Sequence, residues 1–247
     1  MQLKDKVVVV TGSSSGIGQA TALFFAKEGA RVVVNSRNNM QGGQAVVEQI
    51  VKEGGKAVYI QADVSQSEDS KKLIDQAVQQ FGTVDVLINN AGGYESQDFL
   101  TSLKEDWQRI FDCNLFGAIL CSQHVAPMML KQGRGKILNT ASVYGLEHTG
   151  DPTGMAYSVA KAGVISLTKN LAKLWSPQIL VNAIAPGYVH IPRFDQYPEV
   201  VQKDMKSEMR LGRWIEPDEI AHAFLFLAQN DAMTGEIVHV DGGFRLK

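Results

Sequence analysis

The sequence predicts an α/β fold in which a parallel sheet carries helices on both faces, the doubly wound arrangement. Three observations lead to this prediction. Strand-like and helix-like segments alternate along most of the 247 residues. The strand-like segments are short and continuously apolar, which suits strands that are buried on both faces. A glycine-rich turn joins the first of them to a helix-like segment, and a second apolar run follows, which indicates a parallel βαβ unit.

The first unit fills the N-terminal part of the chain. Residues 7–10 are all valine and form the first expected strand. The turn TGSSSGIG at 11–18 leads into a segment whose apolar residues recur at helical spacing. Gly29 stands where this helix should stop, and residues 31–36 form the second expected strand.

The later segments continue the alternation and are interpreted as one domain covering residues 1–247. The expected helices cover 41–53, 67–81, 104–132 and 151–175, and one more begins at Pro217. The expected strands cover 56–61, 84–89, 136–140, 179–184 and 237–240. Residues 188–213 carry prolines, aromatic residues and charges without a strand period, and we interpret them as a flap.

Composition excludes several classes of protein. The chain is 45% hydrophobic and 20% charged, and its formal net charge of -2 leaves no electrostatic footprint for nucleic acid or an anionic membrane. Cys113 and Cys121 fall in one expected helix and are poorly placed for a disulfide, which favours a reducing compartment. The N-terminal segment lacks an apolar signal core, and no stretch approaches the ~18 consecutive apolar residues of a membrane span. A cytoplasmic location is therefore expected.

A ligand site is expected beyond the carboxyl ends of the strands, where their loops converge on one crevice. Glycines in the first loop let the backbone approach a pyrophosphate closely. The helix that begins near Gly16 adds unpaired N–H groups and a positive dipole end. Taken alone, the same residues are explained equally well as a tight strand-to-helix turn.

The end of the second strand bears on the choice of cofactor. An acidic residue at this place would bind the ribose hydroxyls of NAD, but the strand ends in Ser36-Arg37. Arg37 can pair with the 2′-phosphate of NADP, so NADP(H) is favoured over NAD(H). The alternative is an exposed arginine beside a solvated turn, and Ser15 offers no second cation. Asp63, after the third strand, either binds adenine or caps the following turn.

Residues able to carry acid–base chemistry follow later in the chain. Ser142 comes directly after an expected strand, and Tyr157 and Lys161 lie one helical turn apart on the same face. A Tyr-x-x-x-Lys pair on its own is more often part of a solvated helix face. Asn114, in an apolar helix, has a similar alternative, since its side chain can satisfy a neighbouring backbone group.

Several motifs that occur together in a fixed order favour the functional interpretation of these residues over the purely structural one. They are TGSSSGIG at 11–18, NNAG at 89–92, Asn114, Ser142, Tyr157, Lys161 and Pro186-Gly187. The chain thereby resembles the short-chain dehydrogenase/reductase family over almost its whole length. MTG at 233–235 and VDGG at 240–243 extend the resemblance.

The resemblance implies a Rossmann-like fold with a substrate flap at 188–213. It also implies an NAD(P)(H)-dependent oxidoreductase that interconverts a secondary alcohol and a ketone. Tyr157 would exchange a proton with the substrate oxygen, and Ser142 would hydrogen-bond that oxygen. Lys161 would bind the nicotinamide ribose and lower the pKa of Tyr157, and Asn114 would hold a water linked to Lys161.

The resemblance further implies which residues contact the cofactor. They are Gly12, Ser14, Ser15, Gly16, Ile17, Gly18, Ser36, Arg37, Asp63, Val64, Asn90, Ala91, Gly92, Tyr157, Lys161, Pro186, Gly187 and Val189. Ile191 stands where family members often have threonine, so backbone groups near Val189 are expected to bind the carboxamide. The candidate substrate contacts lie in the loops and the flap and are Tyr94, Tyr144, His148, Met155, His190 and Phe194. The histidines and cysteines lack metal-ligand spacing, so no metal is expected.

The substrate itself stays open between two readings. We expect a free small molecule; the alternative is the 3-oxoacyl-acyl-carrier-protein reductase branch, in which basic residues at the ends of two long helices meet an acidic carrier. Lys131, Arg134 and Lys136 supply cations after one helix, whereas residues 175–178 supply none after the other.

Two further classes remain as alternatives. A sensor that binds NADP(H) without turnover is disfavoured by the intact set of candidate catalytic residues. A sugar-nucleotide epimerase would need a larger substrate domain than the chain allows. The resemblance implies a homotetramer, assembled through the two long helices and the C-terminal segment.

Overall fold

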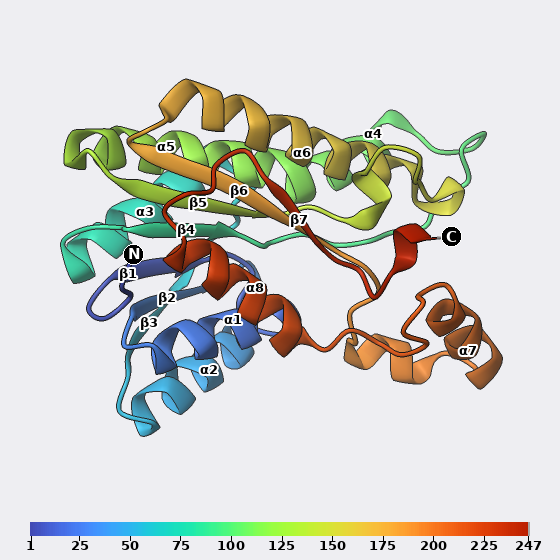
Figure 1. Cartoon of the computed structure of the whole chain (residues 1–247), viewed down its shortest axis with the longest axis horizontal. Helices are drawn as coiled ribbons and strands as arrows, with labels where there is room; N and C mark the ends of the chain where they lie inside the picture. The colour runs from blue at the N-terminus through green and yellow to red at the C-terminus, as the bar shows by residue number, and fades with distance from the viewer. Residues whose placement is uncertain (247) are drawn as a thin grey trace.

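A computed structural model describes residues 1–246 (Figure 1) and confirms the α/β fold with its doubly wound parallel sheet. Within these residues, seven strands form one sheet in the order β3-β2-β1-β4-β5-β6-β7, and all neighbours run parallel. The strands are β1 (Val7–Val10), β2 (Arg31–Ser36), β3 (Lys56–Gln61), β4 (Val86–Asn89), β5 (Gly135–Thr140), β6 (Ile179–Pro186) and β7 (Ile237–Val240). The order reverses direction between β1 and β4, which is where a doubly wound sheet opens a crevice.

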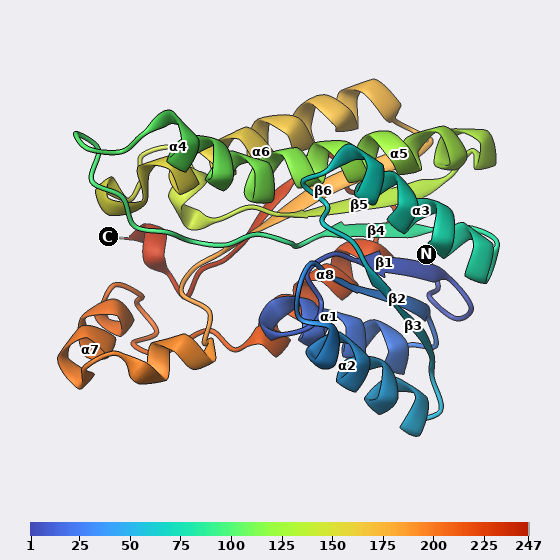
Figure 2. The same cartoon turned by 180° about the vertical axis from the view of Figure 1, so that it is seen from behind.

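Helices cover both faces of the sheet, as Figures 1 and 2 show from opposite sides. One layer contains α1 (Gly16–Lys27), α2 (Met40–Lys52) and α8 (Pro217–Gln229). The other contains α3 (Ser67–Phe81), α4 (Lys104–Phe111), α5 (Gly117–Gln132) and α6 (Met155–Trp175). Two helical layers around one sheet leave the strand ends as the places where loops can gather.

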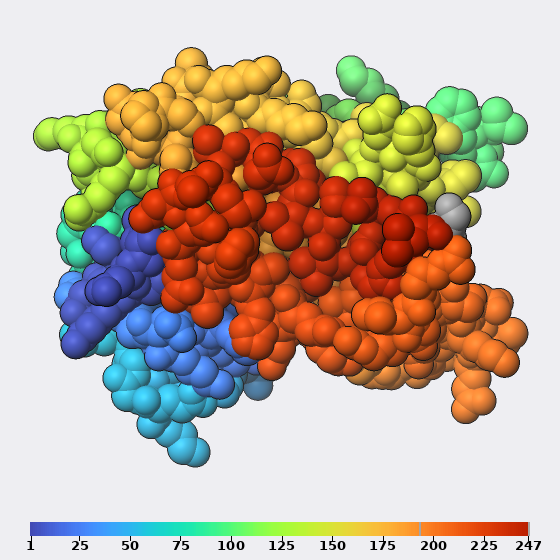
Figure 3. Space-filling view, viewed as in Figure 1, coloured from blue at the N-terminus to red at the C-terminus, as the bar shows by residue number. Residues whose placement is uncertain are grey.

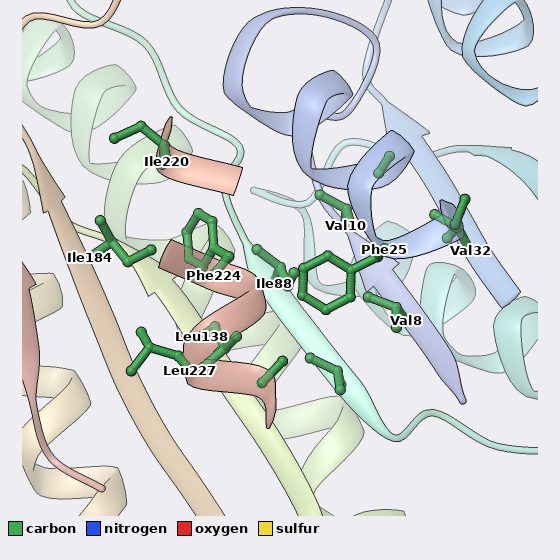
Figure 4. Close-up of a cluster of buried hydrophobic side chains, with 14 of the residues drawn as sticks. Val8, Val10, Phe25, Val32, Ile88, Leu138, Ile184, Ile220, Phe224 and Leu227 are labelled. Atoms are coloured by element: carbon green, nitrogen blue, oxygen red, sulfur yellow. The ribbon is translucent and has the colours of Figure 1, made fainter. Parts of the chain in front are cut away.

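The valines of β1 show why the sheet is buried on both sides. Successive side chains of a strand point to opposite faces. Val8 and Val10 therefore join the cluster under α1 and α8, whereas Val7 and Val9 join the cluster on the opposite face. In the first cluster, Phe25 of α1 and Phe224 of α8 are fully buried (Figure 4). A continuous β-branched run is the sequence pattern that this double burial requires.

The helix expected at 104–132 is interrupted. A π turn at Asp112–Phe116 joins α4 to α5, and it carries Asn114. The helix expected at 151–175 begins as a 3-10 turn at Pro152–Gly154 before it continues as α6. Neither local change alters the layers, but both occur next to the cleft described below.

The segment interpreted as a flap contains regular structure that was not predicted. A 3-10 turn at Pro192–Gln196 and the helix α7 (Glu199–Ser207) extend beyond one end of the sheet (Figure 1). The Leu211 N–H donates to the Gly242 carbonyl at 3.0 Å, which ties the flap to the C-terminal segment. Figure 3 shows the two segments, orange and red, as one continuous surface.

One stretch is long and apolar enough to cross a membrane by length and composition alone. It is Lys104–Gln132, whose most apolar 18-residue window has a mean hydropathy of 1.2. In the folded chain, 44% of that window is buried, and α5 packs against α3, β4 and β5. The core helices of folded proteins meet the same criterion, so this is weak evidence for a membrane span.

Candidate active site

A cleft of about 650 Å³ opens at the carboxyl ends of the central strands. Most residues predicted to bind cofactor or to act in catalysis line it. They are Gly12, Ser15, Gly16, Ile17, Asn90, Ala91, Gly92, Asn114, Ser142, Tyr157, Lys161, Pro186, Gly187 and Val189. Ser14, Gly18, Ser36 and Val64 do not belong to the lining among residues 1–246.

The glycine loop between β1 and α1 has the shape of a backbone cradle. Gly12 and Gly16 adopt left-handed angles, with φ of 62° and 55°, which favour glycine. A Cβ atom on Gly12 would lie 2.8 Å from the Cα of Ala91, and one on Gly18 would lie 2.3 Å from the Gly12 carbonyl oxygen. Among the described residues, a Cβ atom on Gly16 would meet only the Ile191 side chain, at 3.9 Å, so this part of the backbone faces the open cleft. Gly12 and Gly18 are closely packed, and the N-terminus of α1 at Gly16 is open to the cleft. This arrangement suits the binding of a pyrophosphate.

Thr11 joins the glycine loop to the next loop of the cleft. Its hydroxyl oxygen accepts hydrogen bonds from the backbone N–H groups of Asn90 at 2.9 Å and Ala91 at 3.0 Å. The Asn90 amide donates in return to the carbonyls of Thr11 and Gly12 at 3.1 and 3.2 Å. These bonds connect the chain segments on either side of the sheet's reversal point.

Arg37 and Asp63 line two open depressions beyond the carboxyl ends of β2 and β3. The Arg37 side chain is 60% exposed, and its guanidinium lies 3.8 Å from the Asp63 carboxylate. The other oxygen of that carboxylate accepts from the Ser65 N–H at 3.1 Å and the Ser65 hydroxyl at 2.7 Å. Asp63 therefore does cap the following turn. Ser36 is buried with its hydroxyl 2.9 Å from that of Tyr59, whereas the Arg37 side chain is exposed and lines a depression together with Lys72.

Ser142, Tyr157 and Lys161 come together on one wall of the cleft. Ser142 follows β5, and its side-chain oxygen accepts from the Tyr144 N–H at 3.2 Å. The Lys161 ammonium lies 5.5 Å from the centre of the Tyr157 ring and donates to the Thr140 carbonyl at 2.8 Å. Lys161 is 4% exposed, although it carries a charge.

Burial dominates the titration of this group. It raises the pKa of Tyr157, and the hydrogen bond with Ser142 only partly opposes that rise. It lowers the pKa of Lys161 to about 8. The net effect in this structure is a raised pKa of Tyr157, because removing the phenolate from water outweighs the hydrogen bond with Ser142. The expected lowering of this pKa by Lys161, acting with the positive charge of an oxidised nicotinamide, stays a prediction for the enzyme with cofactor bound.

Asn114 satisfies backbone groups, which was the alternative considered for it. Its amide donates to the carbonyls of Gly93 at 2.8 Å and Ile110 at 3.0 Å, and its oxygen accepts from the Gly93 N–H at 3.2 Å. A Cβ atom on Gly92 would meet the Asn114 oxygen at 2.5 Å and the Lys161 ammonium at 3.6 Å. Asn114 thus holds the 90–93 loop while lying beside Lys161, and the π turn that carries it is of a kind frequent at functional sites.

The candidate substrate residues divide into two groups. Tyr94, Tyr144 and Phe194 line the cleft. His148 does not: its φ of 65° places it in a left-handed turn, and its side chain is 87% exposed beside Glu147. His190 is also outside the lining, because Asp195 holds its ring at 2.8 Å and the ring stacks on Trp214. Met155, at the start of α6, likewise lies outside the lining given by residues 1–246.

The sequence did not single out several polar residues that line the cleft, among them Tyr188, Asp151 and Glu208. Tyr188 follows Pro186-Gly187 directly, and this position after a matched motif is a usable signal. Asp151 caps the turn before α6, and Glu208 caps the end of α7. No sequence pattern marks Glu208, because its position depends on how the flap folds back.

The cations considered for docking a carrier lie at the opposite edge of the sheet from the cleft. Lys131 is in the last turn of α5, and Lys136 is at the beginning of β5. Lys136 is only 2% exposed and pairs with Asp231 at 2.7 Å. It is therefore not a surface cation, contrary to the expectation. Across residues 1–246, no cluster of His, Cys, Asp and Glu side chains is arranged to hold a metal ion.

Comparison with known proteins agrees with this architecture. The family model described as enoyl-(acyl carrier protein) reductase matches residues 12–245. A Synechocystis protein named 3-oxoacyl-acyl-carrier-protein reductase is 40% identical, covering 98% of this chain and 97% of its own. Proteins of the same name from Thermotoga maritima and Staphylococcus epidermidis are 38% and 39% identical, covering 98% and 97% of this chain and 99% and 98% of theirs.

A solved structure gives the same result for the fold. A Sinorhizobium meliloti protein described as a short-chain alcohol dehydrogenase aligns with a TM-score of 0.92 and 30% identity. The alignment covers 100% of this chain and 98% of that one. Sequence and fold agree over the full described length, and the chain therefore belongs to the short-chain dehydrogenase/reductase family of oxidoreductases.

Proposed function

We propose that this enzyme interconverts a ketone and a secondary alcohol with NADP(H), using Ser142, Tyr157 and Lys161. The observation that carries the proposal is the meeting of these three side chains on one wall of a cleft whose floor is the glycine loop. A phenol, a hydroxyl and a buried ammonium beside a pyrophosphate cradle are the groups that carbonyl reduction needs.

Each side chain has a separate task in this proposal. Ser142 donates a hydrogen bond to the substrate oxygen and fixes its position. Tyr157 passes its hydroxyl proton to that oxygen in reduction and takes it back in oxidation. Lys161, held by the Thr140 carbonyl, supplies the positive charge that stabilises the Tyr157 phenolate. Asn114 orients the loop at Gly93 that closes this wall.

For Tyr157 to act as an acid or base near neutral pH, its pKa must be lowered when the cofactor is bound. Bringing a phenol from a pKa of about 10 towards neutrality takes about 3–4 kcal/mol. A cation about 4 Å away contributes about 4 kcal/mol at an effective dielectric of about 20. Lys161 is the resident cation, and it must overcome the burial that raises the pKa of Tyr157 in the present structure.

The cofactor would be held by groups on three loops. When bound, the nicotinamide supplies or accepts the hydride. Gly16 and the start of α1 would face the pyrophosphate, and Arg37 would pair with the 2′-phosphate. Gly187 and Val189, which line the far side of the cleft, would bind the carboxamide through their backbone.

A second candidate is reduction of a 3-oxoacyl group on acyl-carrier protein, which the names of the relatives at about 40% identity favour. It uses the same three catalytic side chains. The docking of the carrier would have to employ groups near the mouth of the cleft, because Lys131 and Lys136 lie at the opposite edge of the sheet.

The test is turnover of wild type and Tyr157→Phe with NADPH on a panel of ketones, on a free 3-oxoacyl thioester and on the carrier-bound thioester. Wild type should reduce at least one, and Tyr157→Phe should lose roughly a hundredfold or more in kcat, the contribution of general acid–base catalysis. Strict dependence on the carrier would select the second candidate. Binding of NADPH without turnover across the panel would instead support a cofactor sensor.

We also propose that the enzyme works in the cytoplasm as one catalytic domain assembled into a homotetramer. The support is a near-neutral surface charge and unpaired thiols at Cys113 and Cys121. Exposed apolar side chains on the helical layer of α5 and α6 support assembly.

A further inference from the structure

The substrate end of the cleft contains a chain of two phenols and a carboxylate. The Tyr144 hydroxyl is hydrogen-bonded to the Tyr188 hydroxyl. The Tyr188 hydroxyl in turn donates to Glu208 Oε1 over a long 3.5 Å contact. All three side chains line the cleft, and Ser142 lies two residues before Tyr144. The chain is therefore next to the wall that carries the proposed chemistry.

The direction of this chain follows from the number of protons available. An ionised carboxylate only accepts hydrogen bonds, so the single hydroxyl proton of Tyr188 points to Glu208. The Tyr188 oxygen must then accept from Tyr144, which uses the only hydroxyl proton of Tyr144. What Tyr144 has left is an oxygen lone pair. Towards a ligand, this phenol acts as an acceptor.

A second carboxylate, that of Asp151, fixes the direction of the Tyr94 hydroxyl in the same way. The hydroxyl donates to Asp151 Oδ2 at 2.5 Å. Asp151 Oδ1 accepts from the Thr153 N–H at 2.9 Å and the Thr153 hydroxyl at 2.7 Å. Burial and the bond to Asp151 raise the pKa of Tyr94 to about 12, so its proton stays in place at physiological pH. Its oxygen also lies 3.1 Å from the Thr153 hydroxyl, but the single proton of that hydroxyl is donated to Asp151. Towards a ligand, the Tyr94 phenol is therefore again an acceptor.

Aromatic packing holds the phenols in these positions. The rings of Tyr144 and Tyr188 each meet Phe244 edge-on, with centroids 5.7 and 5.9 Å apart. Tyr94 meets the ring of Tyr157 edge-on at 5.4 Å, which sets it directly beside the proposed catalytic phenol. Acceptors fixed in this way discriminate between ligands, because they cannot turn to donate.

The charge in this part of the cleft has one sign. Asp151 and Glu208 are its carboxylates, and both raise the pKa of Tyr144 through their charge, after burial and the bond to Tyr188. Among the described residues that line the cleft, Lys161 is the one Lys, Arg or His side chain. It is buried and already donates to Thr140. An anionic group entering beside the reacting carbon would therefore meet acceptors and negative charge.

We propose that Tyr144, Tyr188 and Glu208, together with Tyr94 and Asp151, select substrates that carry a hydroxyl or ammonium donor near the reacting carbon. They disfavour substrates with a carboxylate or phosphate at that place. This inference rests on the proposed function of the cleft in ketone reduction, and it adds the substrate class that the cleft accepts. Neutral polyols and amino alcohols share the required donor chemistry.

The test compares methyl ketones of one carbon skeleton that end in a methyl, hydroxyl, ammonium or carboxylate group. Wild type with NADPH should show kcat/KM for the hydroxyl and ammonium ketones roughly tenfold above the methyl ketone, as expected for one net hydrogen bond to a fixed acceptor. The carboxylate ketone should fall roughly tenfold below it. If kcat/KM is higher for the ammonium ketone than for the hydroxyl ketone, the negative charge of the cleft dominates substrate selection. If the two values are equal, the acceptor lone pairs of the phenols dominate it.

The variant Glu208→Gln tests the series of hydrogen bonds from Tyr144 through Tyr188 to Glu208. The substituted side chain carries no charge, and its amide N–H₂ can donate to the Tyr188 oxygen, which allows the hydroxyl protons of Tyr188 and Tyr144 to point towards the ligand. The ratio of kcat/KM for ammonium over carboxylate should fall roughly tenfold or more. Asp204→Asn removes the same charge from an exposed position on α7 and should leave the ratio as in wild type. An unchanged ratio in Glu208→Gln would overturn the proposal.

A second measurement does not depend on turnover. The melting temperature of Tyr157→Phe is measured with each of the four ketones at one concentration. Stabilisation should follow the order of hydroxyl and ammonium above methyl above carboxylate. Loss of turnover in wild type combined with this order would refute the proposed reaction and leave the inference standing. The reverse order, or equal stabilisation by all four, would overturn the inference whatever the activity.

Discussion

Lys161 combines a charge with almost complete removal from water. Its ammonium donates to the Thr140 carbonyl, and burial lowers its pKa from the ordinary 10.5 to about 8. At neutral pH the enzyme therefore retains a costly buried ammonium at the place where the proposed reaction needs a cation. This cost should be visible in stability.

The first prediction concerns the pH dependence of that cost. Between pH 8 and 10.5 the unfolded chain binds more protons at this lysine than the folded chain, so the free energy of unfolding rises with pH in that window. Wild type should gain roughly 2 kcal/mol between pH 7 and 9.5 relative to Lys161→Met, whose position no longer titrates. Urea unfolding at several pH values measures this difference. Parallel profiles for the two proteins would show that Lys161 is not desolvated.

The second prediction concerns Arg37 and the cofactor. Its guanidinium is 60% exposed, and the carboxylate nearest to it is Asp63 at 3.8 Å. Arg37→Ala should weaken NADPH binding roughly tenfold or more through loss of a charge-assisted contact, while NADH binding changes little. Fluorescence titration measures both affinities. Arg134→Ala, at the far edge of the sheet, is the control, and an equal loss for both cofactors would contradict the assignment.

At the scale of elements, the C-terminal end of α8 depends on two cations from distant parts of the chain. Lys136 of β5 donates to the carbonyls of Leu227 at 3.3 Å and Asn230 at 2.6 Å. The amino group of Met1 donates to the Gln229 carbonyl at 2.6 Å. Carbonyls at a helix end have no partner within the helix, and positive charge is favourable there. These contacts connect α8 to both the sheet and the N-terminus.

The third prediction follows from this connection. Lys136→Met keeps the apolar stem but leaves the buried carbonyls at the end of α8 without their donor. The free energy of unfolding should fall by about 1–3 kcal/mol, the cost of unsatisfied buried groups. Lys131→Met, which changes an exposed lysine close by, should have little effect in the same urea titration. A loss of the same size in both variants would point to a general charge effect instead.

At the scale of the whole molecule, the outer side of α5 and α6 is left with apolar residues. Val159 and Leu174 of α6 are 48% and 69% exposed, and Phe116, just before α5, is 40% exposed. Apolar residues on one helical layer suit an interface between copies. This agrees with the proposed assembly through the two long helices.

The fourth prediction tests that assembly. Val159→Glu should place a charge in an apolar contact and shift the particle from tetramer to a smaller species, measured by light scattering after size exclusion. Val200→Glu changes a valine on α7 that is 64% exposed and should leave the mass unchanged. A wild-type mass equal to that of one chain would refute the assembly itself.

Much of the fold could be predicted because its elements are locally encoded. Four consecutive valines define β1, and Gly29 and Gly82 end α1 and α3 where the apolar pattern stops. The π turn at Asp112–Phe116 was missed because one inserted residue hardly disturbs the helical pattern around it. Helix α7 was missed because it has only nine residues, is rich in charged residues, and buries none of its side chains in the core.

The candidate site was predictable only where sequence position determines spatial position. Tyr157 and Lys161 meet because they share a helix face. His148 and His190 belong to the expected segments, but a left-handed turn and the contact with Asp195 direct them elsewhere. Lys136 looks like a surface cation until the fold places the end of α8 over it. Such orientations depend on contacts between residues far apart in the chain.

The two edges of the sheet are specialised in different ways. At the amino edge, the charges are paired and anchor the fold: Lys136 with Asp231, and Lys6 with Asp85. At the carboxyl edge, Lys161 is held at an energetic cost beside the proposed place of reaction. Random substitutions that alter catalysis should therefore lie at the carboxyl edge of the sheet, and those that alter the free energy of unfolding should lie at the amino edge. An evolving lineage could change its substrate at one end while compensating mutations accumulate at the other.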